Sequence, residues 1–179
     1  EFAGIRPDII TLSKSIGGYG LPMALTLIRP DLDVWGPGEH NGTFRGNNPS
    51  FVTATAALNQ FWADDELTQQ VHAKGAIVAE VFESLSTKFD GLSHRGRGLV
   101  RGLVFEEAEL AGQVCALDYE NGLLAETAGP SDEVVKLLPP LTISEEDLRY
   151  GLTILANAVE QVLGTAEEAA TAQPEEVLA

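Results

Sequence analysis

Short β-branched apolar runs and longer stretches of helical periodicity follow one another along this chain, a pattern that predicts a mixed α/β fold. Apolar runs at 8–13 and 23–28 predict two strands, and we expect the first of them to be buried. The glycine-rich segment 17–22 between them predicts a loop. A polar loop at 36–48 leads to a proline, which suits the first turn of a helix over 49–62.

A long amphipathic helix is predicted to start at Asp64 or Asp65. Its apolar residues recur at helical spacings and form one stripe: Leu67, Val71, Val78, Phe82, Leu85 and Phe89. The length of this helix suits an element that links two domains. The pattern then predicts, in order, a strand at 98–106, a helix at 108–121 and strands at 123–127 and 134–138.

The last predicted helix has a clear start, because Ser144-Glu145-Glu146-Asp147 has the spacing of a capping box with Ser144 as the N-cap. The residues that would line its apolar face are Leu148, Leu152, Leu155, Val159 and Val162. After Gly164 the sequence is rich in alanine and glutamate and holds no lysine or arginine. We therefore expect residues 165–179 to form a disordered acidic tail.

The chain is strongly acidic, with a net charge of −16. This charge argues against binding to nucleic acid, because phosphate groups would be repelled. No apolar run approaches the length of a transmembrane helix and no export signal is visible, so we expect no membrane association. The single cysteine, Cys115, cannot form an intrachain disulfide and fits a cytoplasmic setting. The three histidines lack metal-site spacing, and we expect no metal.

Lys14 stands between the first predicted strand and the glycine-rich loop. An ammonium group at the end of a buried strand is costly unless its charge is paired or removed. A covalent bond from this amine to an aldehyde cofactor would remove the charge, and the released amine could act as a general base. By spacing alone, an exposed surface lysine is the simpler interpretation. A P-loop is excluded, because the glycines follow Lys14 instead of preceding it.

Three segments of the chain, in order, resemble the class III (ω-type) aminotransferases. Residues 7–22 resemble the segment that carries the cofactor-binding lysine of this family. Residues 40–49 resemble its glycine- and threonine-containing loop before a helix, and residues 95–103 resemble the strand that enters its C-terminal small domain. The resemblance covers nearly all of residues 1–164.

This resemblance implies a fold and a cofactor. The fold would be that of the fold-type-I transferases that depend on pyridoxal 5'-phosphate (PLP). Residues 1–63 would be the end of the large α/β domain, and residues 64–164 the linking helix and the α+β small domain. Lys14 matches the lysine that holds PLP as a Schiff base. Thr43 matches the threonine that reaches the PLP phosphate of the other subunit, so a homodimer or higher homo-oligomer is implied, acting on an amino donor and a keto-acid acceptor.

Lys136 departs from the family pattern. Many class III enzymes carry an arginine before the apolar-Pro-Pro segment, where it grips the substrate carboxylate through two parallel hydrogen bonds. Lysine offers a single point charge, whereas arginine offers two N–H donors in one plane. Lys136 is therefore a candidate substrate-binding residue, with an ordinary strand-end lysine as the alternative.

The resemblance also implies that several cofactor contacts precede the lysine in sequence: an aspartate at the pyridine nitrogen, an aromatic residue on the ring and a phosphate loop. Only thirteen residues precede Lys14. We therefore expect a C-terminal fragment that binds PLP weakly and has negligible activity alone. Two alternatives stay open. One is a class III enzyme for another ω-amine, or an aminomutase, and the other is a non-catalytic acidic interaction module.

Overall fold

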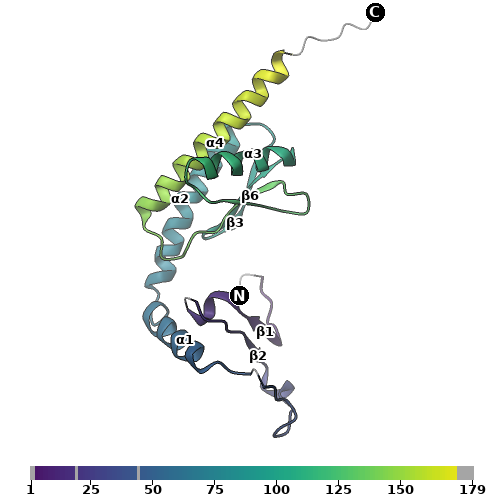
Figure 1. The fold of residues 1–179 in the computed structure, drawn as a ribbon, viewed down its shortest axis with the longest axis vertical. Helices are drawn as coiled ribbons and strands as arrows, with labels where there is room; N and C mark the ends of the chain where they lie inside the picture. Colours follow the sequence, from purple (N-terminus) through teal and green to yellow (C-terminus); the bar gives the residue numbers. More distant parts are fainter. Residues whose placement is uncertain (1–2, 19, 44, 173–179) are drawn as a thin grey trace, which may run out of the picture. The chain divides into compact units, whose positions relative to one another are not determined.

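The computed structural model describes residues 3–18, 20–43 and 45–172. The chain divides into two compact units, Glu1–Glu66 and Leu67–Ala179, each of which is described by itself (Figure 1). The division falls three residues after the end of the predicted first segment, 1–63. Most of the helices and strands that the sequence pattern predicts are confirmed. The differences described below have local physical causes.

The first unit contains a two-stranded antiparallel sheet and one long helix. Strands β1 (Ile9–Leu12) and β2 (Leu25–Ile28) pair with Ile9 opposite Ile28 and Leu12 opposite Leu25. The remaining elements are the 3-10 helices η1 (Lys14–Gly17) and η2 (Pro30–Leu32) and the helix α1 (Asn48–Phe61). An ion pair from Arg29 to Asp8 joins the open ends of the two strands.

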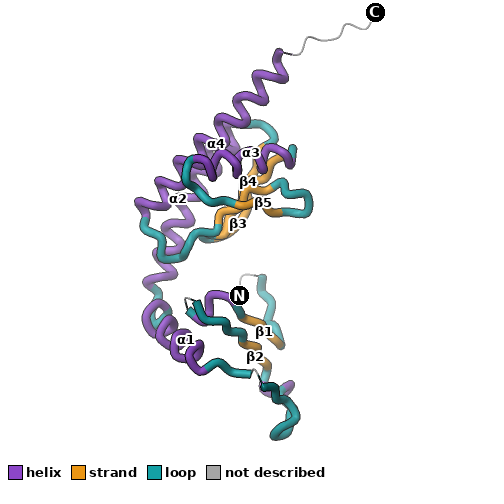
Figure 2. The backbone as a smooth tube through the Cα atoms, viewed as in Figure 1, coloured by secondary structure: helices purple, strands orange, loops and turns teal. Residues whose placement is uncertain are grey.

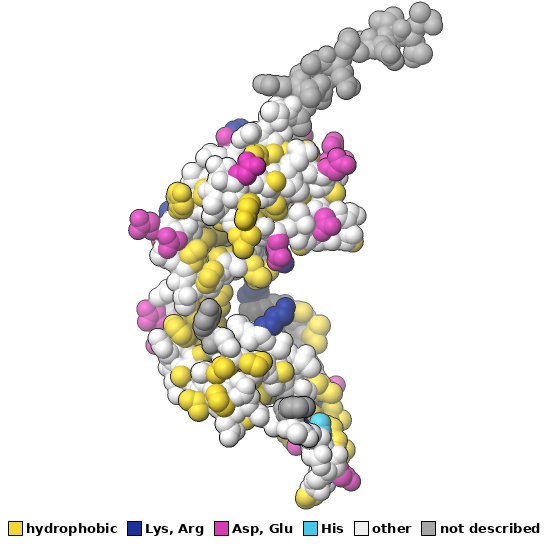
Figure 3. Space-filling view, in the orientation of Figure 1, with side chains coloured by type: hydrophobic (Ala, Val, Ile, Leu, Met, Phe, Trp, Pro, Cys, Tyr) yellow, Lys and Arg dark blue, Asp and Glu magenta, His cyan; other side chains and the backbone are white. Residues whose placement is uncertain are grey.

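The prediction that the first strand is buried is wrong for this chain. The side chains of Ile9 and Leu12 are 53% and 39% exposed. The reason is that β1 pairs with β2 alone in a sheet of two strands, which no further layer of this unit covers in the described residues. The large apolar side chains Leu58 of α1 and Trp62, which directly follows α1, are also exposed. Figure 3 shows hydrophobic side chains on the surface of this unit.

The second unit is an antiparallel sheet with helices packed on it (Figure 2). Its strands lie in the order β3-β4-β6-β5. The strand bounds are β3 (Leu92–Arg97), β4 (Val100–Phe105), β5 (Glu126–Ala128) and β6 (Val134–Leu137). The helices are α2 (Glu66–Lys88), α3 (Ala108–Glu120) and α4 (Glu145–Ala172). Helix α3 packs against β4, β5, β6 and α4.

The main hydrophobic core lies in this second unit. This agrees with the apolar faces that the sequence predicts for its two long helices, α2 and α4. Phe82 of α2, Leu103 of β4, Val114 of α3 and Leu155 of α4 are fully buried in one cluster. Every predicted apolar residue on the face of α4, from Leu148 to Val162, is buried. Burial of each such side chain contributes about 1.5–3 kcal/mol. The core therefore holds the sheet and its helices together as one body.

Strand β3 is absent from the sequence prediction, which placed a single strand at 98–106. The segment has little apolar signal, since of its six residues only Leu92 is buried. It becomes a strand by pairing with β4 through a two-residue turn, in which Arg97 faces Val100. Gly98 opens this turn with a φ of +53°, and two-residue hairpin turns favour glycine because they need positive φ.

Helix α4 starts where the capping box predicts. The Ser144 hydroxyl accepts a 3.0 Å hydrogen bond from the backbone N–H of Asp147. The helix, however, continues past Gly164 to Ala172, so the prediction of disorder is wrong for residues 165–172. Alanine and glutamate are good helix formers, and a single glycine costs only about 1 kcal/mol within a helix. The rest of the predicted tail, 173–179, lies outside the described residues.

Candidate active site

Lys14 stands directly after β1 in an unusual backbone conformation. It is the first residue of η1 and has a φ of 60°, in the left-handed region that residues other than glycine rarely adopt. Such conformations cost about 1–3 kcal/mol and gather at functional sites. The side chain is exposed, and it forms no hydrogen bond or ion pair with the residues that the structure describes. Its amine is therefore available to a reaction partner.

Two hydroxyl groups of α1 hold the glycine-rich loop that follows Lys14. Ser50, which is fully buried, donates a 2.9 Å hydrogen bond to the carbonyl of Pro22. Thr53 donates to the carbonyl of Gly17. These carbonyls lie near the two ends of the loop, so one helix fixes both its entry and its exit. The sequence analysis missed both residues, and the only signal was their position in the first turns of the predicted helix.

Thr43 lies on the exposed loop that precedes α1. A hydrogen bond of 3.1 Å from the backbone N–H of Arg45 to the carbonyl of Gly42 closes a turn around it. The Arg45 side chain donates to the carbonyl of His40, and the side-chain amide of Asn41 donates to the carbonyl of Gly38 at 2.9 Å. The loop is thus held by its own polar groups, while the Thr43 side chain is exposed.

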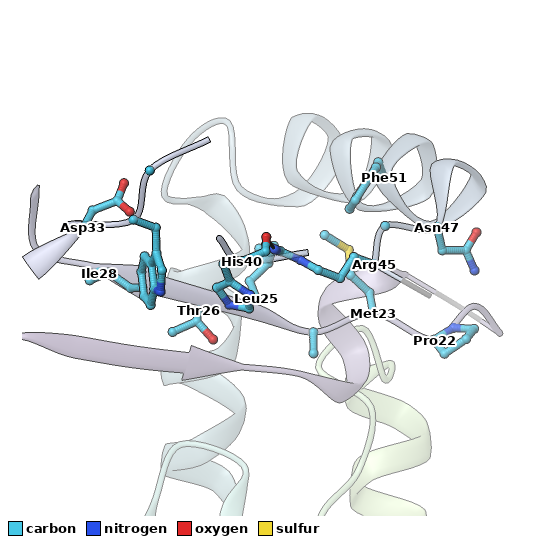
Figure 4. Close-up of a pocket in the computed structure, with 14 residues that line it drawn as sticks. Pro22, Met23, Leu25, Thr26, Ile28, Asp33, His40, Arg45, Asn47 and Phe51 are labelled. Atoms are coloured by element: carbon cyan, nitrogen blue, oxygen red, sulfur yellow. Dashed lines mark hydrogen bonds between the residues drawn. The ribbon is translucent and has the colours of Figure 1, made fainter. Parts of the chain in front are cut away.

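A cavity of about 830 Å³ lies between β2, this loop and the start of α1 (Figure 4). Met23, Leu25 and Phe51 provide apolar lining, and Arg45 and His40 provide polar groups. Neither Lys14 nor Thr43 is among its lining residues. The cavity therefore adjoins the Thr43 loop without containing the candidate residues themselves.

Lys136 lies on β6 of the second unit and forms an ion pair. Its Nζ is 2.7 Å from Oε1 of Glu126, which stands directly opposite on β5. The hydrogen bond and the positive charge of Lys136 lower the pKa of the Glu126 carboxyl. The sequence analysis missed Glu126, because a cross-strand neighbour is known only once the strand register is known. Lys74 on α2 donates a 3.1 Å hydrogen bond to the carbonyl of Leu141, beyond the Pro139-Pro140 segment.

The structure places Lys14 and Thr43 in the first unit and Lys136 in the second. No hydrogen bond or ion pair joins any two of these three within residues 3–18, 20–43 and 45–172. Lys14 and Thr43 fit an aldehyde cofactor that carries a phosphate, because one offers an amine with no partner in the described part of the chain and the other an exposed hydroxyl. Lys136 offers a positive charge that is already paired with Glu126.

A buried carboxyl group, Asp118, lies on α3 outside these sites. Its side chain is fully buried, and neither carboxyl oxygen has a hydrogen-bond partner within the described part of the chain. Burial raises its pKa to about 7. Cys115, one turn earlier, is half-buried. Its burial is the main cause, and the negative charge of Asp118 the second, of a thiol pKa that is raised to about 11. The thiol therefore stays protonated at neutral pH.

Two further searches cover only the residues that the structure describes. Within them, no group of three or more histidine, cysteine, aspartate or glutamate side chains could hold a metal ion. No helix in the same residues is long and apolar enough to cross a membrane.

Comparison with known proteins identifies the family. Residues 1–159 match the class III aminotransferase family. The chain belongs to the class III aminotransferases. Among relatives of this family, a diaminobutyrate–2-oxoglutarate transaminase of Nocardia farcinica is 60% identical over 162 residues, and one of Streptomyces anulatus is 56% identical over 161 residues. Each alignment covers 90% of this chain. The chain spans 37% and 38% of the lengths of these two relatives.

Solved structures of other aminotransferases share the fold. An acetylornithine aminotransferase of Elizabethkingia anophelis is 29% identical, with a TM-score of 0.77 over 89% of this chain and 40% of that one. An ornithine aminotransferase of Toxoplasma gondii, with PLP in partial occupancy at its active site, is 27% identical, with a TM-score of 0.79 over 92% and 39%. The fold is thus that of the PLP-dependent transferases of fold type I.

Proposed function

We propose that the whole protein is a cytoplasmic PLP-dependent aminotransferase with the activity of a diaminobutyrate–2-oxoglutarate transaminase. It would convert glutamate and aspartate 4-semialdehyde into 2-oxoglutarate and 2,4-diaminobutyrate, a precursor for ectoine synthesis. The observation that carries this proposal is the exposed amine of Lys14 at a strained position, which has no partner among the described residues, in a chain 60% identical to a relative of that name. Residues 1–63 then belong to the large domain and residues 64–164 to the small domain.

Lys14 performs two tasks in this proposal. Its amine would hold PLP through a covalent bond to the aldehyde, and it would become free when an amino donor takes its place. Bound PLP supplies an electron sink for the carbon that carries the amino group. Once released, Nζ of Lys14 would act as a general base and acid and move a proton at that carbon. The exposed setting of the side chain leaves room for this movement.

Thr43 would hold the cofactor phosphate, and it would do so across the interface of a homodimer. A hydroxyl on an exposed loop donates well to a phosphate oxygen, and nearby backbone N–H groups add to the attraction. Each active site would then need two copies of the chain. Dilution below the dimer dissociation constant should therefore release PLP.

Lys136 would bind the substrate carboxylate through its charge. An ammonium group attracts a carboxylate without fixing its plane, in contrast to an arginine fork. The positive charge is held on β6 by the ladder of hydrogen bonds to β4 and β5. Its pairing with Glu126 means that a substrate must compete with, or share, that carboxylate.

The assay that tests this function measures kcat/KM of the whole protein with PLP for several amino donors and 2-oxoglutarate. We expect 2,4-diaminobutyrate to exceed ornithine, acetylornithine and 4-aminobutyrate by at least about tenfold. A higher kcat/KM for one of the other donors would assign the protein to a different class III reaction. Activity that does not depend on PLP, or no activity with any donor, would contradict the proposal and favour a non-catalytic role.

A further inference from the structure

A cavity of about 510 Å³ opens beside β5 and β6 in the second unit. Its lining is mainly leucine and proline side chains, among them Leu124, Leu138 and Pro140. Of its lining residues, only Glu126 and Lys136 are charged. A negative and a positive group thus stand side by side in an otherwise apolar wall.

The two charged groups are placed by strand register. Glu126 and Lys136 are directly opposite on neighbouring antiparallel strands, so their side chains leave the sheet on the same face. Their charged atoms are 2.7 Å apart, with side-chain exposures of 67% and 31%. Both groups are reachable from the cavity, and each can accept a new partner.

A ligand that matches this wall must carry both signs of charge close together. The α-carbon of an amino acid carries an ammonium and a carboxylate as neighbours. Such a group would place its ammonium on Glu126 and its carboxylate on Lys136. The two charges of the ligand and the two of the side chains would then alternate in sign, so that each charge has an opposite charge beside it. The apolar lining lowers the dielectric constant on the side of the pair that faces the cavity, and this strengthens the attractions relative to bulk water.

We propose that Glu126 and Lys136 together bind the zwitterionic α-amino acid end of the substrate, with Glu126 as the acceptor for the α-ammonium group. This inference rests on the proposed function, in which the reacting amine is at the other end of the substrate. It assigns to Glu126 a specificity role: the pair selects ω-amines that carry both α-groups over ω-amines that carry only one.

A purely structural role makes a different prediction. Exposed cross-strand ion pairs contribute little to stability. Loss of such a pair would change the binding of all substrates alike, because none of them would contact it. Selectivity among related amines therefore separates the two roles.

The experiment compares three amines that differ only in their α-groups. 2,4-Diaminobutyrate carries both, 4-aminobutyrate carries the carboxylate alone and 1,3-diaminopropane carries the second ammonium alone. The apparent binding constant of each is measured on the whole protein with PLP, as KM where it reacts and as a competitive Ki where it only inhibits. The variants are Glu126→Gln and Lys136→Gln.

We expect Glu126→Gln to lower the preference for 2,4-diaminobutyrate over 4-aminobutyrate about tenfold. Lys136→Gln should lower the preference for 2,4-diaminobutyrate over 1,3-diaminopropane by a similar factor. The matched control is Glu160→Gln, which removes a 2.7 Å ion pair with Lys88 on exposed helix surfaces of the same unit. This control should keep both preferences within twofold of the unsubstituted protein.

The possible failures are distinct. If the unsubstituted protein does not transaminate 2,4-diaminobutyrate with 2-oxoglutarate, the proposed function fails. If it does, but both preferences stay within twofold in Glu126→Gln and Lys136→Gln, the zwitterion site is refuted while the function stands. A change of equal size for all three amines would assign the pair a structural role only.

Discussion

The buried hydroxyl of Ser50 donates a 2.9 Å hydrogen bond to the carbonyl of Pro22, 28 residues earlier in the chain. Pro22 ends the glycine-rich loop that begins after Lys14, so this bond connects the candidate catalytic lysine to α1. With the bond from Thr53 to Gly17, it holds a loop whose glycines would otherwise be free to move. We therefore expect this support to affect the position of the Lys14 amine.

Substitution of Ser50 by alanine should weaken the cofactor site. The Pro22 carbonyl would lose its partner in a buried setting, which costs about 1–3 kcal/mol. We expect a lower thermal midpoint and several-fold faster loss of PLP on dialysis. The control is Thr55→Ala, because Thr55 of the same helix donates only to the carbonyl of Phe51, one turn earlier. Equal PLP retention in the two variants would contradict the supporting role of Ser50.

Close packing of α2 on the β3–β4 turn makes Gly75 sensitive to substitution. A Cβ at this position would lie 2.9 Å from Cα of Gly98, which is backbone and cannot swing away. Gly75→Ala should therefore destabilise the protein by about 1–3 kcal/mol. Gly112→Ala is the matched control, since a Cβ there meets nothing within 4 Å on an exposed face of α3. It should instead stabilise by about 0.5–1 kcal/mol, as measured by denaturant unfolding.

Asp118 should make stability depend on pH. Its folded pKa of about 7 lies above the usual 3.8, so the folded state holds its proton more tightly than the unfolded state does. Its contribution is therefore complete below about pH 4 and is lost progressively as the pH rises to 7. The difference between the two pKa values corresponds to about 4 kcal/mol.

The variant Asp118→Asn removes this dependence. We expect a higher thermal midpoint than that of the unsubstituted protein at pH 8 and a smaller difference at pH 5. The control Glu120→Gln removes an exposed carboxylate from the same helix and should not reproduce the change. If the difference between Asp118→Asn and the unsubstituted protein is the same at both pH values, Asp118 does not bind a proton in this range.

The sequence predicts those features that depend on local pattern. The apolar stripe of α4 and its Ser144 cap lie where periodicity and capping chemistry place them. Strand β3 and the partnership of Glu126 with Lys136 could not be predicted, because both arise from strand pairing between distant residues. The exposure of Leu12 was predicted wrongly for a related reason: burial depends on which layers cover a strand, and an apolar run does not reveal them.

Asp118 shows a further limit of sequence analysis. An aspartate within a helical pattern indicates an exposed position, since aspartate is almost never fully buried without a partner. Only the packing of α3 against β5, β6 and α4 reveals that this side chain is enclosed. Lys14 is a different case, because its assignment as the cofactor lysine rests on the family resemblance, while its spacing alone favours a surface lysine.

The central claim, that Lys14 binds PLP covalently, is tested most directly by trapping the bond. The whole protein is loaded with PLP, reduced with borohydride, digested and analysed by mass spectrometry. We predict that the reduced cofactor is found on the peptide that contains Lys14, and that Lys14→Ala loses both this label and the visible absorbance of bound PLP. A label on another lysine, or unchanged absorbance in Lys14→Ala, would contradict the account.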